Sequence, residues 1–211
     1  MIIMVNIFRF QSLNSTNTKA ISMAKEGMAE AAVLAETQSG GRGRLGRSFS
    51  SPKGGLYLSY LTSRLAAGSS VLALTPAAAL AVRRAIFRTF GLSCAIKYPN
   101  DLILQDRKVC GILCESVAME GRFCVVIGVG INVYSDVVLR DGSLSQPPDY
   151  PPGALKDFCK KAEDPASLEE LTSQLIGELE RLINDFASGG SLDEAEYRKH
   201  CINCPEVIIQ Y

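Results

Sequence analysis

The chain of 211 residues has no tryptophan, a single histidine and no net charge. A zero net charge argues against nonspecific nucleic-acid binding as the main activity, because such binding depends on an excess of cations. The sequence also lacks an apolar run of the roughly 20 residues that span a bilayer, since residues 71–82 are followed at once by Arg83 and Arg84. Its first residues show neither a basic segment nor a cleavage signature, so we expect no export signal and a cytosolic protein.

Cysteine is present in a pattern that disfavours a disulfide framework. The seven cysteines are an odd number and lie mostly inside apolar runs, which is typical of buried, reduced thiols. Cys201 and Cys204 lie beside His200, but no second Cys/His pair stands at zinc-finger spacing. We therefore assign neither a metal nor a redox role to this pair.

Composition and charge distribution limit the class of protein and the kind of ligand. A hydrophobic fraction of 47% with 21% charged residues is typical of a soluble globular protein. A chain of this length forms one sizeable domain with a small appendage and buries roughly 70% of its unfolded surface. Residues 1–111 hold 14 Lys/Arg and five Asp/Glu, whereas residues 112–211 hold eight and 17. We therefore expect an anionic ligand to bind to the first half.

Hydrophobic periodicity and capping residues predict mixed secondary structure in the first half of the chain. A long loop between two strands stands out there, because long ordered loops are usually functional. The expected elements are a helix capped by Ser15, Thr16 and Asn17, a strand over residues 31–37, a loop to Gly55, a strand over residues 56–62, and a helix that begins at Thr75 and Pro76 and ends at Gly91.

The second half begins with consecutive strands, which predict an antiparallel meander. The expected strands are residues 94–97, 102–104, 109–119 and 123–133. A Pro- and Ser-rich surface excursion over residues 134–165, with a helical turn near Leu155, is expected next. Two helices should follow, one opened by a capping box at residues 167–170 and one opened at residues 191–194, and then a strand over residues 205–211.

The residues Gly41–Arg47 place three arginines and three glycines in one loop. Arginine presents a planar fork that matches carboxylate and phosphate oxygens, and glycine lets backbone amides approach an oxyanion. The loop is thus suited to an anion, although alone it is also typical of a flexible basic tail or a nucleic-acid contact.

Three more segments stand out downstream: Lys97–Asp101, Lys108–Glu115 and Gly128–Asn132. Each has an ordinary structural explanation when taken alone, as a turn, a solvated strand end or a bulge. Together with Ser15–Asn17, Gln38 and the Arg/Gly loop, in this order and spacing, they closely resemble the catalytic domain of biotin protein ligases. The resemblance is close over residues 12–133 and loose over residues 165–190.

This resemblance implies an α/β (α+β) fold in which helices back a mixed, mainly antiparallel sheet, the biotin/lipoate ligase fold similar to class II aminoacyl-tRNA synthetases. Residues 1–190 would form the biotin- and ATP-binding catalytic domain, and residues 191–211 the start of an incomplete C-terminal SH3-like domain. The family motifs begin by Ser15, so we expect no DNA-binding repressor domain. Tyr98 replaces the tryptophan usual in its motif.

The resemblance further implies two half-reactions: biotin and ATP form biotinyl-5′-AMP, and a lysine of a carrier protein then accepts the biotin. Arg42 and Arg44 would hold phosphate and carboxylate oxygens, Lys108 would bridge the carboxylate and the α-phosphate, and Asp101 would accept a proton from the incoming lysine or orient it. The implied biotin-binding residues are Ser15, Thr16, Gln38, Gly41, Arg42, Arg44, Lys108, Gly111, Gly128 and Gly130. The implied ATP-binding residues are Arg42, Arg44, Arg47, Phe49, Lys108 and Asn132.

ATP and biotin are thus the expected substrates, with Mg²⁺ accompanying ATP and no metal site made by the protein itself. The expected partner is a biotin-acceptor (carboxyl carrier) protein, with no DNA or membrane partner, and the family implies a homodimer. A lipoate-protein ligase and a non-catalytic biotin or nucleotide binder are the alternatives.

Overall fold

Seven strands form one sheet in the computed structural model, which describes residues 5–66, 71–119, 121–136 and 149–208. In spatial order they are β1 (Ile7–Leu13), β2 (Glu30–Gln38), β3 (Gly55–Thr62), β7 (Arg122–Asn132), β6 (Arg107–Met119), β5 (Asp101–Leu104) and β4 (Ala95–Lys97). β1 and β2 run parallel, and the other neighbouring pairs are antiparallel. The expected mixed, mainly antiparallel sheet and the meander from β4 to β7 are therefore confirmed.

Four α-helices and three short 3₁₀ turns accompany this sheet in the described part of the chain. They are α1 (Thr16–Lys25), α2 (Val71–Phe90), α3 (Ala166–Ala187), α4 (Glu194–His200), η1 (Arg44–Gly46), η2 (Leu155–Asp157) and η3 (Lys160–Glu163). None of the described helices combines the length and the apolar character needed to cross a bilayer.

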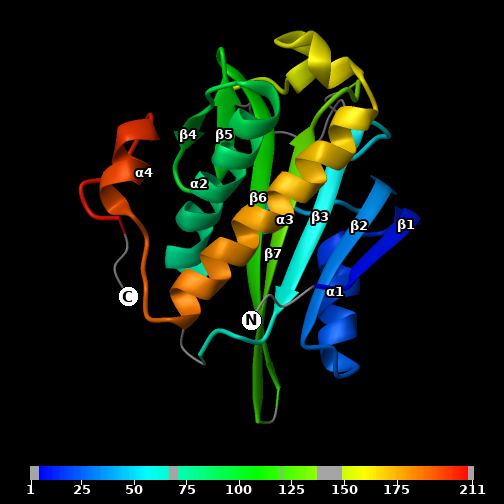
Figure 1. The fold of residues 1–211 in the computed structure, drawn as a ribbon, viewed down its shortest axis with the longest axis vertical. Coiled ribbons are helices and arrows are strands. Elements are labelled where there is room, and N and C mark those ends of the chain that lie inside the picture. The colour runs from blue at the N-terminus through cyan, green and yellow to red at the C-terminus, as the bar shows by residue number, and fades with distance from the viewer. Residues whose placement is uncertain (1–4, 67–70, 120, 137–148, 209–211) are drawn as a thin grey trace.

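The two faces of the sheet bury different helices, because successive side chains of a strand point to opposite faces. Figure 1 shows α2 and α3 across one face. On β7, Val125, Ile127 and Val129 pack in the core under these two helices, whereas Cys124 and Val126 pack in a second core with α1. Positions 128 and 130 continue the α1 face of β7, and both are glycine. On the face of β7 that points toward α1, positions 128 and 130 therefore carry no side chain.

The helix α2 begins earlier than its sequence predicts. Thr75 and Pro76 were expected at its start, but the helix begins at Val71 and Pro76 lies inside it. Proline removes one backbone donor, a loss that a helix tolerates best near its N-terminal end, and the apolar residues before it extend the helix. The predicted end is right, because Gly91 has a positive φ of 71° and donates its N–H to the Phe87 carbonyl.

The capping predictions for α3 and α4 were also wrong in detail. Ser167 does not cap α3 but lies inside it, and Asp164 accepts the Ala166 N–H through its side chain. At α4, the residue before the first helical turn is Asp193 rather than Ser191, and its carboxylate accepts the Glu196 N–H at 2.9 Å. At α4 an aspartate close to the expected serine is therefore the N-cap, a role that either residue type serves well, whereas the N-cap position of α3 is Pro165.

Two differences lie at the ends of the chain. β1 was not predicted; its alternating Phe8 and Phe10 pack against the α1 core while Arg9 points away to pair with Glu169. No strand forms over residues 205–208, and the rest of the expected terminal strand lies outside the described residues. Tyr197 and Ile208 are buried in the same core as α2 and α3. The start of a second domain at residue 191 stays a prediction.

The cysteines are free, as predicted, and three of the seven, Cys94, Cys110 and Cys124, are buried. Burial raises the pKa of Cys94 and of Cys114 to about 12. Burial also raises the pKa of Cys201, as does a hydrogen bond with Cys204. These thiols are therefore kept protonated and unreactive near neutral pH.

The α4 cap can be tested by substitution. We expect Asp193→Ala to lower the free energy of unfolding by about 1 kcal/mol, because the Glu196 N–H loses its acceptor. Ser191→Ala is the matched control and should change stability by less than about 0.5 kcal/mol. Urea unfolding of both variants measures this difference. A larger loss in the serine variant, or no loss in the aspartate variant, would contradict the assignment.

Candidate functional site

A cavity of about 240 Å³ opens on the α1 side of the sheet, where glycines replace side chains. Gly111 of β6 lies opposite Gly130 of β7, and Gly128 lies one position further along that face. Of the fourteen residues that the sequence predicted for the site, all but Gly41 and Asn132 line this cavity. The cavity thus joins segments that lie more than a hundred positions apart in the chain, from Ser15 to Gly130.

The glycines make room for two side chains of the protein itself. A Cβ atom at Gly130 would lie 2.6 Å from the Phe49 ring, and one at Gly111 would lie 3.0 Å from it. A Cβ at Gly128 would lie 2.0 Å from the Asn17 side-chain oxygen. Phe49 therefore lies flat against the bare strands, with its ring edge-on to Tyr57 at a centroid distance of 6.4 Å.

Polar side chains at the start of α1 and the end of β2 form one end of the cavity, and Ser59 of β3 supports them. Ser15 caps α1, and the next residue, Thr16, donates its N–H to Gln38 Oε1 at 2.8 Å and its hydroxyl to the same oxygen at 3.1 Å. Gln38 Nε2 donates to Ser51 at 2.8 Å. Ser59, fully buried, lies 2.8 Å from Thr16 Oγ1. These partners fix the amide of Gln38 in one orientation, with a defined donor and acceptor beside the cavity.

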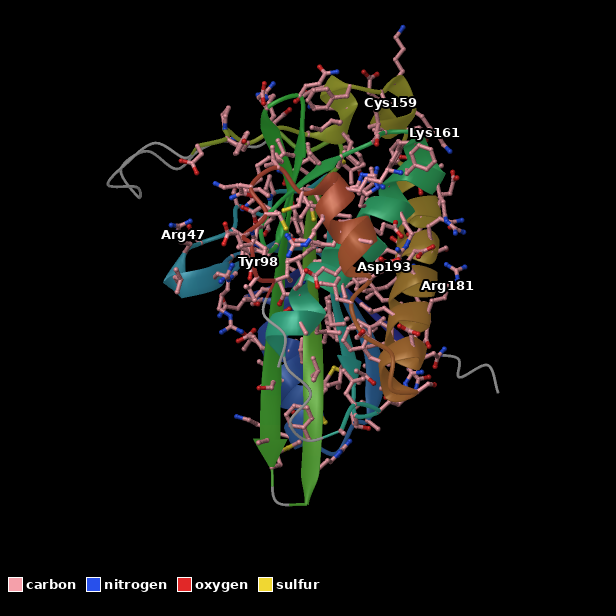
Figure 2. All side chains as sticks on the ribbon, turned by 90° about the vertical axis from the view of Figure 1, so that its left-hand side faces the viewer. Arg47, Tyr98, Cys159, Lys161, Arg181 and Asp193 are labelled. Atoms are coloured by element: carbon pink, nitrogen blue, oxygen red, sulfur yellow. The ribbon has the colours of Figure 1, made fainter. Side chains whose placement is uncertain are left out.

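The Arg/Gly loop forms a compact hairpin over the cavity. Arg42 pairs with Ser48 in an antiparallel bridge, and the Phe49 N–H donates to the Gly41 carbonyl at 2.8 Å. Leu45 at the tip has a positive φ of 55° and is 90% exposed. Figure 2 shows Arg47 on this projecting loop, on the side of the molecule away from Arg181 of α3.

Two arginines of the loop contact the body of the protein. Arg42 Nη2 donates to Glu115 Oε2 at 2.7 Å, and Arg44 Nη1 donates to Asn100 Oδ1 at 3.3 Å. Asn100 is itself fixed, because its Nδ2 donates to the Ile112 carbonyl at 2.9 Å. The loop is therefore tied to β6 and to the turn before β5.

Lys108 and Asp101 form an ion pair beside the cavity, with 2.7 Å between Nζ and Oδ2. The Lys108 backbone is held by residues 151 and 153, which accept and donate one hydrogen bond each. Asp101 Oδ1 is buried without a hydrogen-bond partner among the described residues. Asp101 therefore has one oxygen paired with an ammonium group and one buried oxygen without a partner among the described residues.

The charge balance of the cavity favours an anion. Among the described residues that line it, five are cationic and one, Asp101, is anionic. The cations are Arg42, Arg44, Arg47, Lys97 and Lys108. Like charges gathered around a concave surface raise the local concentration of anions. The described part of the chain holds no group of three or more His, Cys, Asp or Glu side chains that could bind a metal.

Gly41 and Asn132 lie behind the cavity instead of lining it. A Cβ at Gly41 would lie 2.4 Å from the Phe49 carbonyl, so this glycine permits the hairpin to close. Asn132 is 3% exposed and donates to the Gly153 carbonyl at 2.9 Å. Both residues position their neighbours in this structure.

Several lining residues had no predicted role, although they lie within the motifs. Lys97, Tyr98 and Asn100 belong to the turn before β5, and Asn17 belongs to the first turn of α1. Ser59 was also missed; it does not line the cavity, but its hydroxyl contacts Thr16 and Asn17, which do. Their contacts depend on which strands are neighbours, and motif spacing does not report that.

The segment after α4 supports this turn from behind. Asn203 Oδ1 accepts the Tyr98 N–H at 2.8 Å, and the Ile202 N–H donates to the Ile96 carbonyl at 2.9 Å. The Tyr197 ring packs edge-on against the Tyr98 ring. Residues near the end of the chain therefore help to place one wall of the cavity.

Comparison with known proteins agrees with this geometry. A family model described as the biotin/lipoate A/B protein ligase family matches residues 7–132. The chain is 36% identical over 149 residues to the bifunctional ligase/repressor BirA of Bacillus subtilis, a match that covers 69% of this chain and 42% of that protein. It is 35% identical over 166 residues to the biotin–acetyl-CoA-carboxylase ligase of Paracoccus denitrificans, covering 75% of this chain and 66% of that protein. The matches thus span less than two thirds of either relative.

A solved structure shares the fold. The biotin protein ligase from Aquifex aeolicus in complex with biotin and ATP superposes with a TM-score of 0.71 at 24% identity, covering 88% of this chain and 73% of that one. The predicted biotin/lipoate ligase fold is therefore confirmed.

The close contact between Gly130 and Phe49 can be tested by double substitution. We expect Gly130→Ala to lower the free energy of unfolding by about 1 to 3 kcal/mol, because the new methyl group overlaps the ring. The cost should largely disappear in a Phe49→Ala background. Gly177→Ala, at a helical position with open space around it, is the control and should not destabilise the protein. Urea unfolding that shows equal Gly130→Ala losses in both backgrounds would exclude the proposed contact.

Proposed function

Because the chain belongs to the biotin/lipoate A/B protein ligase family, we propose that it is an ATP-dependent biotin protein ligase. It would join biotin to ATP to form biotinyl-5′-AMP and then transfer the biotin to a lysine of a carboxyl carrier protein. The observation that carries this proposal is the cavity with a polar, neutral end and a strongly cationic end. Such a cavity matches a neutral ring that bears a carboxylate at the far end of an apolar tail.

The neutral end is suited to the ureido group of biotin. Thr16 and Gln38 offer a hydroxyl and an amide held in fixed orientations, and Ser15 lies beside them. A ureido group needs aligned donors and acceptors, since a buried polar group without a partner is costly. The ring and tail would lie along the bare strand surface at Gly128 and Gly130.

The cationic end is suited to the meeting of two anions. Biotin's carboxylate oxygen would attack the α-phosphorus of ATP, so that a new O–P bond forms, the bond to the bridging oxygen of the β-phosphate breaks, and pyrophosphate leaves. Arg42 and Arg44 would hold carboxylate and phosphate oxygens, and Arg47 would help to bind pyrophosphate. Lys108 would stabilise the charge that grows at the α-phosphate.

In the second half-reaction the carrier lysine's amine would attack the carbonyl carbon of the mixed anhydride and expel AMP. Asp101 is the candidate acceptor for the amine's proton, since the residue lines the cavity and one of its oxygens has no partner among the described residues. Its other oxygen is occupied by Lys108. Asp101 would also orient Lys108.

The nucleotide would lie near Phe49, whose ring borders the cavity, and near Asn132 at the end of β7. Mg²⁺ would arrive with ATP and neutralise its phosphates. The described residues offer one lining carboxylate, so most ligands of the ion would be phosphate oxygens and water. The tie of Arg42 to Glu115 and of Arg44 to Asn100 supports a small anionic ligand over a nucleic acid for this loop. We further propose that the reaction takes place in the cytoplasm and that the protein forms a homodimer.

Pyrophosphate exchange into ATP tests the first half-reaction. We expect exchange that depends on biotin and is absent with lipoate or octanoate. Exchange with lipoate or octanoate alone would replace the biotin assignment with that of a lipoate ligase. No exchange with any of the three acids would favour a non-catalytic binder.

Substitution of Lys108 tests the assignment of the cationic end. We expect Lys108→Ala to lower the rate of adenylate formation on the order of 100- to 1,000-fold and to change biotin affinity only a few-fold. Lys53→Ala is the control, because this lysine is exposed and pairs with Glu36. Calorimetric titration with biotin and the exchange assay separate the two effects. Undiminished adenylation in the Lys108 variant would refute the role.

A further inference from the structure

Two motif residues, Asn17 and Glu115, have no role in the proposed chemistry, yet they meet beneath Arg42. Asn17 Nδ2 donates to Glu115 Oε2 at 2.8 Å, and Arg42 Nη2 donates to the same oxygen at 2.7 Å. One carboxylate oxygen therefore joins the first turn of α1 to the Arg/Gly loop.

Asn17 is held in place on every side. It is 5% exposed, its Oδ1 accepts from Ser59 at 2.5 Å, and its Nδ2 also approaches the Leu113 carbonyl at 3.2 Å. Gly128 leaves the space that the amide fills, since a Cβ there would lie 2.0 Å from Asn17 Oδ1. A buried amide with its donor and acceptor both satisfied has one stable orientation. Asn17 therefore fixes the position of the Glu115 carboxylate.

Glu115 lies behind the cavity wall. It follows Gly111 and Leu113 on one face of β6, and those two residues line the cavity while Glu115 does not. Its side chain is 25% exposed, against 43% for Arg42. The ion pair uses one guanidinium nitrogen of Arg42, which leaves the other N–H groups to face a ligand. Arg42 can thus bind Glu115 and an anion at the same time.

We propose that Glu115, fixed by Asn17, is a positioning residue that holds the Arg42 guanidinium at the cavity before the anion binds. A long, half-exposed arginine without such a partner loses rotamer freedom each time it binds a ligand. Pairing with Glu115 already restricts the Arg42 side chain in the folded protein, so that less rotamer freedom is lost when the anion binds. The assignment of the anion as biotin's carboxylate or an ATP phosphate rests on the proposed function, whereas the positioning of Arg42 does not.

A double-mutant cycle tests this proposal. Glu115→Ala should lower the rate of adenylate formation about tenfold in the wild-type background and have no further effect in an Arg42→Ala background, because Glu115 acts through that arginine. Glu115→Gln should recover most of the rate, since its amide oxygen still accepts from Asn17 and Arg42. Glu36→Ala, which removes an exposed glutamate of β2, is the matched control.

Two results would overturn the proposal. Equal losses for Glu115→Ala in both backgrounds would show a general structural effect. Tighter anion binding in the Glu115→Ala and Glu115→Gln variants would show that the glutamate competes with the ligand.

The same cycle measured without turnover separates this inference from the proposed function. Calorimetry with inorganic pyrophosphate should show weaker binding in Glu115→Ala than in the wild type, and equal binding in Arg42→Ala and the double variant. If biotin supports no exchange but this cycle shows coupling, the ligase assignment fails and the positioning role stands. Failure of the wild type to bind pyrophosphate, or the absence of coupling, would remove the positioning role.

Discussion

Mutual repulsion among the cations around the cavity constrains the rest of the site. Arg42, Arg44, Arg47, Lys97 and Lys108 line one small space, and like charges at such separations destabilise a folded chain unless each is held by a partner. Three of these five cations have a carboxylate partner in the structure. Lys108 pairs with Asp101, Arg42 with Glu115, and Lys97 with Asp149 at 2.5 Å. These three cations are thereby fixed in place and remain able to attract a polyanion.

The site also needs the strand backbone to be closely approachable, and the sheet provides this. Side chains on the α1 face of β7 are apolar where the helix covers them, as at Val126, and absent at Gly128 and Gly130. Gly111 on β6 extends the bare area. Phe49 and Asn17 fill part of this space, and the remainder forms the cavity. A single methyl group at these positions would therefore disturb an aromatic contact or a buried amide, which explains why the chemistry needs glycine in strands that otherwise favour branched residues.

The sequence predicts the residues of this site better than their contacts. Motif order identified Arg42, Lys108 and Gly130 correctly as neighbours of one cavity, because each motif is short and local. The capping aspartate Asp193 was missed because serine and aspartate serve equally at a helix start, and only the backbone path distinguishes them. The early start of α2 was missed because a proline near a helix start can be the first helical residue or can lie inside the helix. The meeting of Asn17 with Glu115 depends on the register of β6 against β7 and on the position of α1, which no local pattern contains.

Support for the cavity also comes from beyond the segment that matches the family model. Residues 151 and 153 bind the backbone of Lys108, and Gly153 also accepts a hydrogen bond from Asn132. Asn203 holds the Tyr98 backbone, and Tyr197 packs against the Tyr98 ring. The side chains that line the cavity thus come from the matched region, while the backbones of Lys108 and Tyr98 are held by segments that follow it in the chain. Pro151 and Gly153 act through backbone groups, so that many side chains would serve at position 151, whereas Asn203 and Tyr197 contribute their own side chains. The end of the family match at residue 132 is therefore not the end of the residues that shape the cavity.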